Sequence, residues 1–432
     1  MFSTFQWDHL TDDQTQLLEP LHMDVVLAGG VHHHTNGAFS GRVMWADMTR
    51  RVPEFRFAGW APSPVAAEIP RHKRVCQADR HGLKVSHSFR ELVRQSVETN
   101  GPDNTLACIA VDTDLHVQLI QEAVEAGARF IWSDKPIVVK MTDLQTLLEL
   151  CAKNQALRIF GAQNHRYCAS ALLQRQEAQR ALREGRTVDL RTGFWQAWLL
   201  GDQESRQALS RLLDFRTTLA DLGAHDFDLE EFILGMMVQA LFEGVGLHGL
   251  TGKFANNFTG GTCKLEFADP NATGSIDVDQ CREDALMDDL WSWLKIEGEQ
   301  DILWRMGHHG GNSVCTAKIN DPDMLNRDDW NDPVEFGSSA FGKVSSDFPG
   351  WSPPGHDPHC WPNMWRTHAM AILGEVARIL GLEIAKQGLL PPHMCLPVPE
   401  IRGTGRRTAQ YINAHVKSAR LCGARVELAD VA

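Results

Sequence analysis

The chain has 432 residues, of which 43% are hydrophobic and 22% are charged. Because one hydrophobic core usually stops growing at roughly 250–300 residues, this length predicts two domains. No stretch reaches the roughly 18–20 consecutive apolar residues of a membrane helix. The net charge is −13, and no run of Lys and Arg could follow a phosphate backbone. These features argue against a membrane span and a nucleic-acid partner, and favour a small-molecule partner.

The first 22 residues and the cysteines bear on the compartment. Residues 1–22 form a polar lead-in without the basic start, apolar core and cleavage site of a secretory signal. The ten cysteines are scattered, with no C-x-x-C pair and no zinc-ribbon spacing. We therefore expect reduced packing cysteines and a cytoplasmic protein.

Residues 23–165 alternate short apolar runs with helical patterns. The runs are β-branched or aromatic and lack polar alternation, as strands buried on both faces of a parallel sheet require. This pattern predicts a doubly wound α/β domain. The expected strands are 25–28, 55–60, 83–86, 106–111, 130–132 and 157–160, and the expected helices are 39–51, 89–98, 115–126 and 142–153.

Residues 166–432 show a different pattern. Segments with polar alternation, such as 188–195 and 261–267, indicate an α+β domain with a large, mostly antiparallel sheet. Helices are expected near 226–234 and over 364–385 and 408–421. Whether the last helices pack on this domain or back on the first stays open.

A glycine-bearing turn follows the first expected strand and leads into a helix. The glycines of the turn and their neighbours are Gly29, Gly30, Gly37, Ala38 and Phe39. Glycines at such a turn let the backbone approach a pyrophosphate. Their spacing does not match G-x-G-x-x-G, so a plain strand-to-helix turn is an equal alternative. After the second strand, Ser63 stands where an acidic residue would bind an adenosine ribose, which leaves both NAD and NADP possible.

The segment from residue 107 to residue 166 carries the most specific motifs. A strand leads to Asp112-Thr113-Asp114-Leu115-His116, a helix ends in Glu125-Ala126-Gly127, and the next strand ends in Asp134-Lys135-Pro136. This order resembles the Gfo/Idh/MocA family of NAD(P)-dependent sugar and cyclitol oxidoreductases. That family carries T-P-N-x-x-H after a strand, then a helix ending in A-G-x-x-V, then (E/D)-K-P.

Further blocks extend the resemblance along the chain. Asp221-Leu222-Gly223-Ala224-His225 fits the family's D-x-G-x-H, at the start of a helix that lines the substrate pocket. Pro354-Gly355-His356 resembles a P-x-G-H segment, and Gln196-Ala197-Trp198-Leu199 resembles a Q-x-W-L strand. The resemblance implies a Rossmann-like domain, a substrate-binding α+β domain, and a homodimer or homotetramer.

The resemblance also implies the chemistry and the residues that perform it. The expected reaction moves a hydride between NAD(P) and a secondary hydroxyl of a sugar, cyclitol or related polyol. Such a reaction needs a group that exchanges a proton with the hydroxyl oxygen. Lys135 is the expected proton donor and acceptor, His225 its partner or the base, and Asp221 the residue that orients His225.

Two sets of binding residues follow from the resemblance. The cofactor, NAD or NADP, is expected to contact Gly29, Gly30, Gly37, Ala38, Phe39, Ser63, Val111, Asp112, Thr113, His116, Asp134, Lys135 and Asn164. The substrate is expected to contact Lys135, Trp198, Asp221, His225 and His356. Taken singly, each catalytic residue has a structural alternative, namely a surface lysine in a turn or a helix N-cap beside a satisfied histidine.

Departures from the family pattern leave other functions open. Val111-Asp112-Thr113 replaces T-P-N, and residues 213–220 replace a glycine-rich stretch. A catalytically divergent protein of the same fold that binds a dinucleotide or sugar fits these changes. An NAD-dependent, redox-assisted glycoside hydrolase is the other alternative. The histidine groups at 32–34 and 308–309, with His356 and His359, form no set such as H-E-x-x-H, so no metal is expected.

Overall fold

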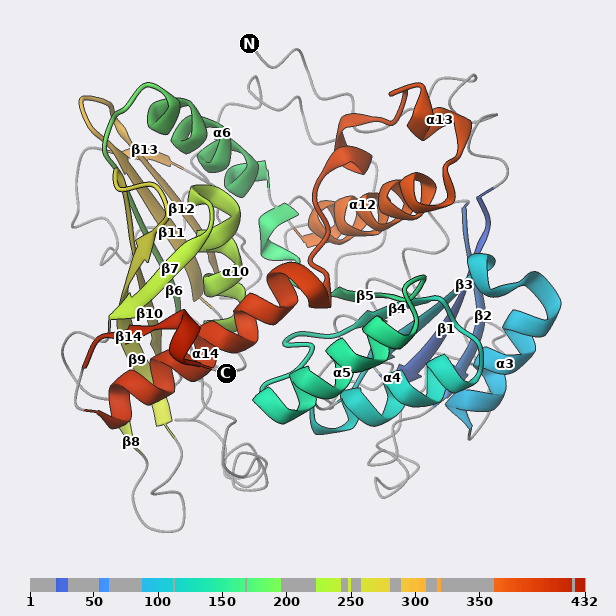
Figure 1. Cartoon of the computed structure of the whole chain (residues 1–432). Coiled ribbons are helices and arrows are strands. Elements are labelled where there is room, and N and C mark those ends of the chain that lie inside the picture. Colours follow the sequence, from blue (N-terminus) through green and yellow to red (C-terminus); the bar gives the residue numbers. More distant parts are fainter. Residues whose placement is uncertain are drawn as a thin grey trace. The chain divides into compact units, whose positions relative to one another are not determined.

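The computed structural model describes residues 21–29, 54–61, 88–111, 113–167, 169–195, 223–241, 248–249, 258–279, 289–307, 317–319, 361–421 and 424–431. The chain divides into two compact units, each built on its own sheet (Figure 1). The first unit comprises Gln6–Gln163 and Pro362–Arg407. The second contains Asn164–Trp361 and Thr408–Ala432. The division falls between residues 163 and 164, where we expected it between 165 and 166.

The first unit contains a five-stranded parallel sheet in the order β2-β1-β3-β4-β5. Its strands are β1 (Met23–Gly29), β2 (Phe55–Ala61), β3 (Thr105–Ala110), β4 (Phe130–Ser133) and β5 (Arg158–Gly161). Every residue of β1, β3 and β4 is buried, as the unbroken apolar runs predict for a sheet covered on both faces. The predicted doubly wound α/β domain is therefore confirmed. The expected helix 39–51 and strand 83–86 lie outside the described residues.

In the described part of the first unit, the helices between these strands are α3 (Phe89–Asn100), α4 (His116–Glu125) and α5 (Met141–Lys153). The N-cap of α3 is Ser88, whose hydroxyl accepts a hydrogen bond of 3.2 Å from the backbone amide of Glu91. The helix buries residues at a helical spacing, namely Phe89, Leu92, Val93 and Ser96. Figure 1 shows α4 and α5 side by side against the sheet.

A segment from the end of the chain completes the first unit. It contains α12 (Trp361–Leu380) and α13 (Glu383–Lys386). Trp132 of β4 contacts His368 of α12, with ring centroids 6.4 Å apart. The sequence pattern predicted one continuous helix over 364–385. This prediction is wrong, because the segment forms two helices with a break between them. Gly381 adopts a φ of 63° and donates its amide to the Arg378 carbonyl, which ends α12.

The second unit contains a nine-stranded mixed sheet in the order β13-β12-β11-β6-β10-β9-β7-β14, with β8 pairing β9. The strands are β6 (Val188–Trp195), β7 (Met237–Leu241), β8 (His248–Gly249), β9 (Phe258–Phe267), β10 (Ala272–Asp279), β11 (Asp289–Ile296), β12 (Asp301–Gly307), β13 (Ala317–Ile319) and β14 (Val426–Glu427). Within the described ranges, β10 and β6 are parallel and the other pairs are antiparallel. The predicted α+β class with a mostly antiparallel sheet is confirmed.

The long helices in the described part of this unit are α6 (Ala169–Arg183), α10 (Gly223–Leu234) and α14 (Arg406–Arg420). The buried Gln174 of α6 joins that helix to the sheet. Its amide donates to the carbonyls of Ser292 and Ile302 over 3.2 and 3.0 Å, and its carbonyl accepts from the Ser292 hydroxyl over 2.8 Å. The carboxamide is thus fully used, as a buried polar group must be.

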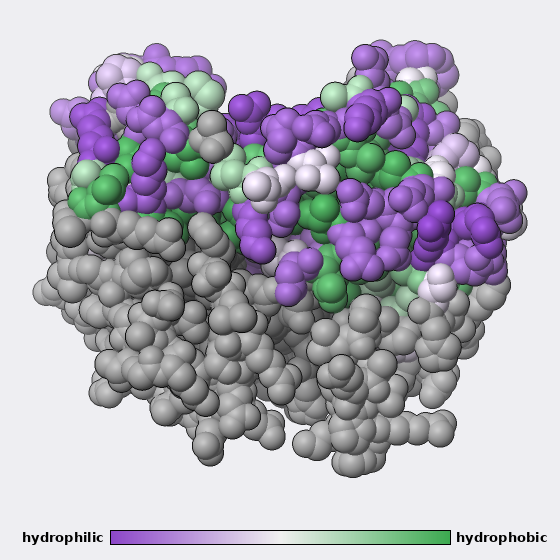
Figure 2. Space-filling model, turned by 60° about the horizontal axis from the view of Figure 1, so that its bottom comes forward, coloured by the Kyte–Doolittle hydropathy of each residue, from purple (hydrophilic) through white to green (hydrophobic). Residues whose placement is uncertain are grey.

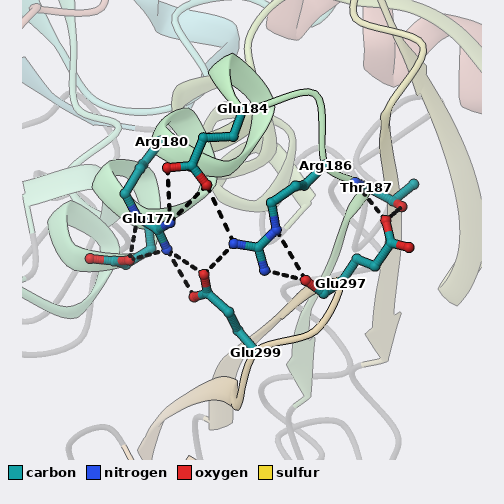
Figure 3. A network of polar contacts seen from close by, with 7 residues as sticks. All are labelled: Glu177, Arg180, Glu184, Arg186, Thr187, Glu297 and Glu299. Carbon is teal, nitrogen blue, oxygen red and sulfur yellow. Dashed lines mark hydrogen bonds and ion pairs between the residues drawn. The ribbon is translucent and has the colours of Figure 1, made fainter.

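An ion-pair network joins the end of α6 to the β11–β12 turn (Figure 3). At its centre, the Arg180 guanidinium contacts both carboxylate oxygens of Glu299, at 2.7 and 2.8 Å. The remaining members of the network are Glu177, Glu184, Arg186, Thr187 and Glu297. These groups are partly exposed, so each pair stabilises the fold only slightly and salt screens it.

The surface of the described residues is mostly polar. Figure 2 shows hydrophilic residues over much of the coloured face, with hydrophobic ones in small separate groups. Among the residues that the structure describes, the exposed large hydrophobic side chains are Met236, Val238, Leu389 and Leu421. None of the described helices combines the length and apolar composition that a membrane span requires.

Candidate functional site

The carboxyl ends of β1 and β3 form the point where the strand order of the first sheet reverses. Open α/β sheets bind their ligands at this point. Gly29 ends β1 with a φ of 73°, and a Cβ atom there would lie 2.4 Å from the Ala110 carbonyl oxygen and 2.5 Å from Val111 Cγ1. Trp60 of β2 donates its indole N–H to the Gly29 carbonyl over 3.0 Å. Only glycine therefore fits at position 29, where the end of β1 packs closely against the end of β3.

His116 joins the two loops that follow β3 and β4. Its Nδ1 lies 3.1 Å from the carbonyl oxygens of both Pro136 and Ile137, and its Nε2 lies 3.0 Å from the carbonyl oxygen of Val111. The side chain is fully buried. Both ring nitrogens of His116 thus contact backbone carbonyls, in the Lys135 loop and in the loop after β3. The resemblance had implied that His116 contacts the cofactor.

Lys135 stands just beyond the carboxyl end of β4. The backbone amide of Asp134 donates to the Ile109 carbonyl over 2.8 Å, which holds the loop against β3. The Asp134 carboxylate accepts from the Lys135 amide over 2.9 Å. Lys135 is half-buried, and the peptide bond to Pro136 is cis. Thr113, on the loop after β3, begins the 3₁₀ turn Thr113–Leu115.

Two amides beyond β5 present buried polar atoms. In the part of the chain that the structure describes, both side-chain amide atoms of Gln163 lack a hydrogen-bond partner, and Gln163 is 1% exposed. Among the described residues, the buried Oδ1 atom of the adjacent Asn164 also lacks a hydrogen-bond partner. Unpaired buried amides cost free energy, so such atoms fit a ligand with its own amide or hydroxyl groups. Sequence reasoning included Asn164 but missed Gln163, because one Gln next to an expected contact carries no separate signal.

The second unit holds His225 on α10, where all twelve helical residues are buried. Four of these residues are acidic, and three of them have partners that explain the burial. The carboxylate of Asp228 pairs with the Arg166 guanidinium, that of Glu231 accepts from the Tyr411 hydroxyl over 2.6 Å, and that of Glu230 accepts from the Thr192 hydroxyl over 3.1 Å. The partners lie on three different segments, which together enclose the helix.

Asp226 and Glu230 lie one helical turn apart on α10. Burial is the main cause that raises the pKa of Asp226 well above its usual value, and the nearby Asp277 raises it further. Burial likewise raises the pKa of Glu230, while its hydrogen bond from Thr192 opposes the shift and Asp226 adds to it. Burial inside this unit therefore disfavours the ionised form of both side chains.

His225 is stacked on His165, which belongs to the 3₁₀ turn His165–Tyr167. The ring centroids are 3.8 Å apart with an interplanar angle of 27°. Phe194 of β6 packs against both rings, with centroids 6.1 Å from His165 and 6.4 Å from His225. Sequence reasoning missed His165, because 60 positions separate the two histidines and no local pattern connects them.

The remaining expected site residues lie outside the described residues. They are Gly30, Gly37, Ala38, Phe39, Ser63, Asp112, Trp198, Asp221 and His356. Lys135 belongs to the first unit and His225 to the second. No group of three His, Cys, Asp or Glu side chains that could hold a metal ion occurs within the described ranges.

Comparison with protein families supports the first unit as a nucleotide-binding domain. The Gfo/Idh/MocA model, described as an oxidoreductase family with an NAD-binding Rossmann fold, matches residues 49–161. This match confirms the predicted resemblance, the NAD(P) cofactor class and the assignment to NAD(P)-dependent oxidoreductases. A comparison with curated proteins found no match.

Solved structures share the fold of the whole chain. An inositol dehydrogenase homolog from Azotobacter vinelandii, crystallised with NADH and myo-inositol, is 15% identical with a TM-score of 0.63, over 94% of this chain and 97% of that one. The WlbA dehydrogenase from Bordetella pertussis, in complex with NADH and UDP-GlcNAcA, is 14% identical with a TM-score of 0.60, over 94% and 98%. An oxidoreductase from Sinorhizobium meliloti is 15% identical with a TM-score of 0.60, over 94% and 99%. At these identities the likeness defines the fold alone.

Proposed function

We propose that this protein transfers a hydride between NAD(P) and a secondary hydroxyl of a sugar, cyclitol or related polyol. The single observation that carries the proposal is Lys135 at the carboxyl end of β4, in a loop held by Asp134 and His116 within an NAD-binding fold. Neighbours of the same fold that were crystallised with myo-inositol or UDP-GlcNAcA support the substrate class.

The described residues fit a nicotinamide dinucleotide. Gly29 allows the ends of β1 and β3 to pack closely at the switch point, where open α/β sheets bind ligands, and Gln163 offers an unpaired buried amide beyond β5. When bound, the nicotinamide supplies the hydride acceptor or donor. Gly29, Val111, Thr113 and Asn164 are the described residues that we propose to hold the cofactor, and Gln163 joins them.

The protein's own groups handle the proton. In the oxidative direction the hydroxyl O–H bond breaks and Lys135 takes the proton as the carbonyl forms, while the hydride leaves carbon. In the reductive direction Lys135 returns the proton to oxygen. We propose His225 as the partner of Lys135 or as the base, and Asp221 as the residue that orients it.

We further propose that copies of the chain associate through the nine-stranded sheet. The face away from α6 and α10 carries exposed side chains of both signs, including Arg191, Lys264 and Glu266. Such a face can pair with a second copy through complementary charges. Light scattering during size-exclusion chromatography tests this, and a monomer at all concentrations would contradict it.

The experiment starts with fluorescence titrations of the purified protein with NAD, NADH, NADP and NADPH. A screen of polyols and sugars with the bound cofactor follows. Lys135→Ala should then reduce kcat/KM by about 10²- to 10⁴-fold, the usual size of an acid–base contribution. Lys140→Ala, which removes an exposed lysine at the end of the same loop, serves as the matched control. Full turnover by Lys135→Ala would refute the proposed role.

A further inference from the structure

The stack of His165 on His225 brings two imidazole rings into close contact inside the second unit. The centroids lie 3.8 Å apart, and the side chains are 3% and 6% exposed. Phe194 closes one flank of the pair. In this packing the ring plane of His225 is determined by His165, because a rotation of either ring would break the stack.

A second bridge joins the same two segments. Arg166 directly follows His165, and its guanidinium forms a two-point pair with Asp228, three residues after His225. Both members of the pair are almost fully buried. The stack and the ion pair therefore hold the His165–Tyr167 turn and α10 in one arrangement.

The stack also restricts charge. Two imidazolium rings at this separation, away from water, would repel each other strongly, since like charges in a buried site cannot both ionise readily. One neutral ring and one charged ring can stack, and so can two neutral rings. The pair should therefore titrate in two separated steps that belong to both residues together.

Among the described residues around the pair, most charged groups are paired with one another or favour their neutral form through burial. Within the described ranges, the titratable or charged side chains on the elements packed around the pair include Arg166 and Tyr167 on the turn, Arg175 on α6, Asp189 on β6, Asp226, Asp228, Glu230 and Glu231 on α10, Asp277 on β10, and Tyr411 and His415 on α14. Arg166 and Asp228 neutralise each other, and Glu231 is bound by the Tyr411 hydroxyl. Burial favours the neutral forms of Asp226 and Glu230. Phe194 is apolar.

We propose that His165 is a positioning residue for the reaction, which stacks on His225 and shares a single proton charge with it. This inference rests on the proposed function, in which His225 is the partner of Lys135 or the base. His165 would hold the imidazole of His225 in the plane from which it meets the substrate. It would also keep at least one ring of the pair neutral over the range in which the enzyme works.

The first test needs no turnover. Histidine ring nitrogens of the ¹⁵N-labelled full chain are titrated by NMR in the unaltered protein, in His165→Phe and in His225→Phe. We expect the two histidines of the unaltered protein to titrate in two steps. The midpoint of the lower step should lie at least about one pH unit below the single midpoint of either variant. His415, whose pKa burial lowers to about 3, provides a neutral internal reference. Independent titration of both rings with the single-variant values would overturn the shared charge.

The second test separates positioning from folding. His165→Ala should lower kcat by about tenfold to a hundredfold with little change in KM, since a small misplacement of a catalytic group has effects of this size. At pH values above the lower titration step, His165→Phe should keep most of the kcat that His165→Ala loses, because a flat ring remains in the stack. Phe194→Leu is the matched control, since it alters the same ring cluster but leaves both histidines, and should keep the two-step titration.

The outcomes distinguish this inference from the proposed function. If no nicotinamide-dependent turnover is found, the proposed function fails, and the NMR titration still decides whether the pair shares one charge. If turnover depends on Lys135 but His165→Ala retains full kcat, the proposed function stands and the positioning role is refuted. A coupled titration together with rescue by His165→Phe would support both.

Discussion

The Arg166 guanidinium and the Asp228 carboxylate form a two-point ion pair inside the second unit, with side chains 3% and 1% exposed. Arg166 also lies over the ring of Phe232, with 4.9 Å between the guanidinium carbon and the ring centroid. Two charges withdrawn from water are tolerated only when each satisfies the other in good geometry. This pair connects the turn that carries His165 to the helix that carries His225.

We predict that Asp228→Asn destabilises the protein by about 3–5 kcal/mol, because the Arg166 guanidinium would stay buried without a counter-charge. Urea unfolding followed by circular dichroism measures the loss. Glu375→Gln is the control, since it breaks a 2.7 Å ion pair with Arg378 at the surface and should cost less than about 1 kcal/mol. Equal losses in the two variants would contradict the assigned burial.

Gly29→Ala should weaken dinucleotide binding and lower stability together. The added Cβ would lie 2.4 Å from the Ala110 carbonyl oxygen, so β1 and β3 would have to separate at the switch point. Gly101→Ala is a matched control, because Gly101 also has a positive φ of 87° but nothing lies within 4 Å of its added Cβ. The Gly101→Ala variant therefore has the strain of an alanine at positive φ, about 1–2 kcal/mol, without a steric clash. Fluorescence titration with NADH should show unchanged binding by Gly101→Ala and at least a tenfold weaker affinity for Gly29→Ala, which corresponds to about 1.4 kcal/mol.

His116→Leu should weaken NAD(P) binding by about tenfold or more. The backbone carbonyls of Val111, Pro136 and Ile137 would lose their contacts with the imidazole nitrogens of His116, and a buried acceptor left unsatisfied costs about 1–3 kcal/mol. Isothermal titration with the preferred nucleotide gives the affinity. The same substitution at the exposed His22, just before β1, should leave binding unchanged. An unchanged affinity in His116→Leu would show that the two loops keep their places without it.

The stability of the second unit should fall as the pH rises above the ordinary range of carboxyl groups. Burial raises the folded-state pKa of Glu230, so the folded protein keeps a proton that the unfolded chain loses above pH of about 4. The stabilisation is complete below that pH and is lost as the pH approaches the folded-state pKa. Glu230→Gln is neutral throughout and removes this loss.

Urea unfolding at pH 5, 6, 7 and 8 checks this prediction. The free energy of unfolding of Glu230→Gln relative to the unaltered protein should increase with pH, by up to about 1.4 kcal/mol per unit. Glu383→Gln is the control, because contact with Lys386 lowers the pKa of the exposed Glu383 and its effect is confined to acid pH. A constant difference for Glu230→Gln across this range would mean that Glu230 is ionised in the folded protein.

The sequence by itself determined the five strands of the first unit's sheet, its helices α3, α4 and α5, and the loop that carries Lys135. The buried strands of a parallel sheet leave unbroken apolar runs, and helices leave a 3.6-residue period, so neighbouring residues suffice to predict them. The order of the motifs along the chain was enough to indicate the oxidoreductase family, and the family match over residues 49–161 agrees.

Only the tertiary structure decided which distant side chains meet. Arg166 and Asp228 are 62 positions apart, and Glu231 and Tyr411 are 180 apart, so no spacing rule connects them. The same holds for His165 on His225 and for the carbonyls around His116. The sequence pattern could not reveal that α10 is buried on every side, because its four acidic residues are typical of an exposed face until their partners on other segments are known.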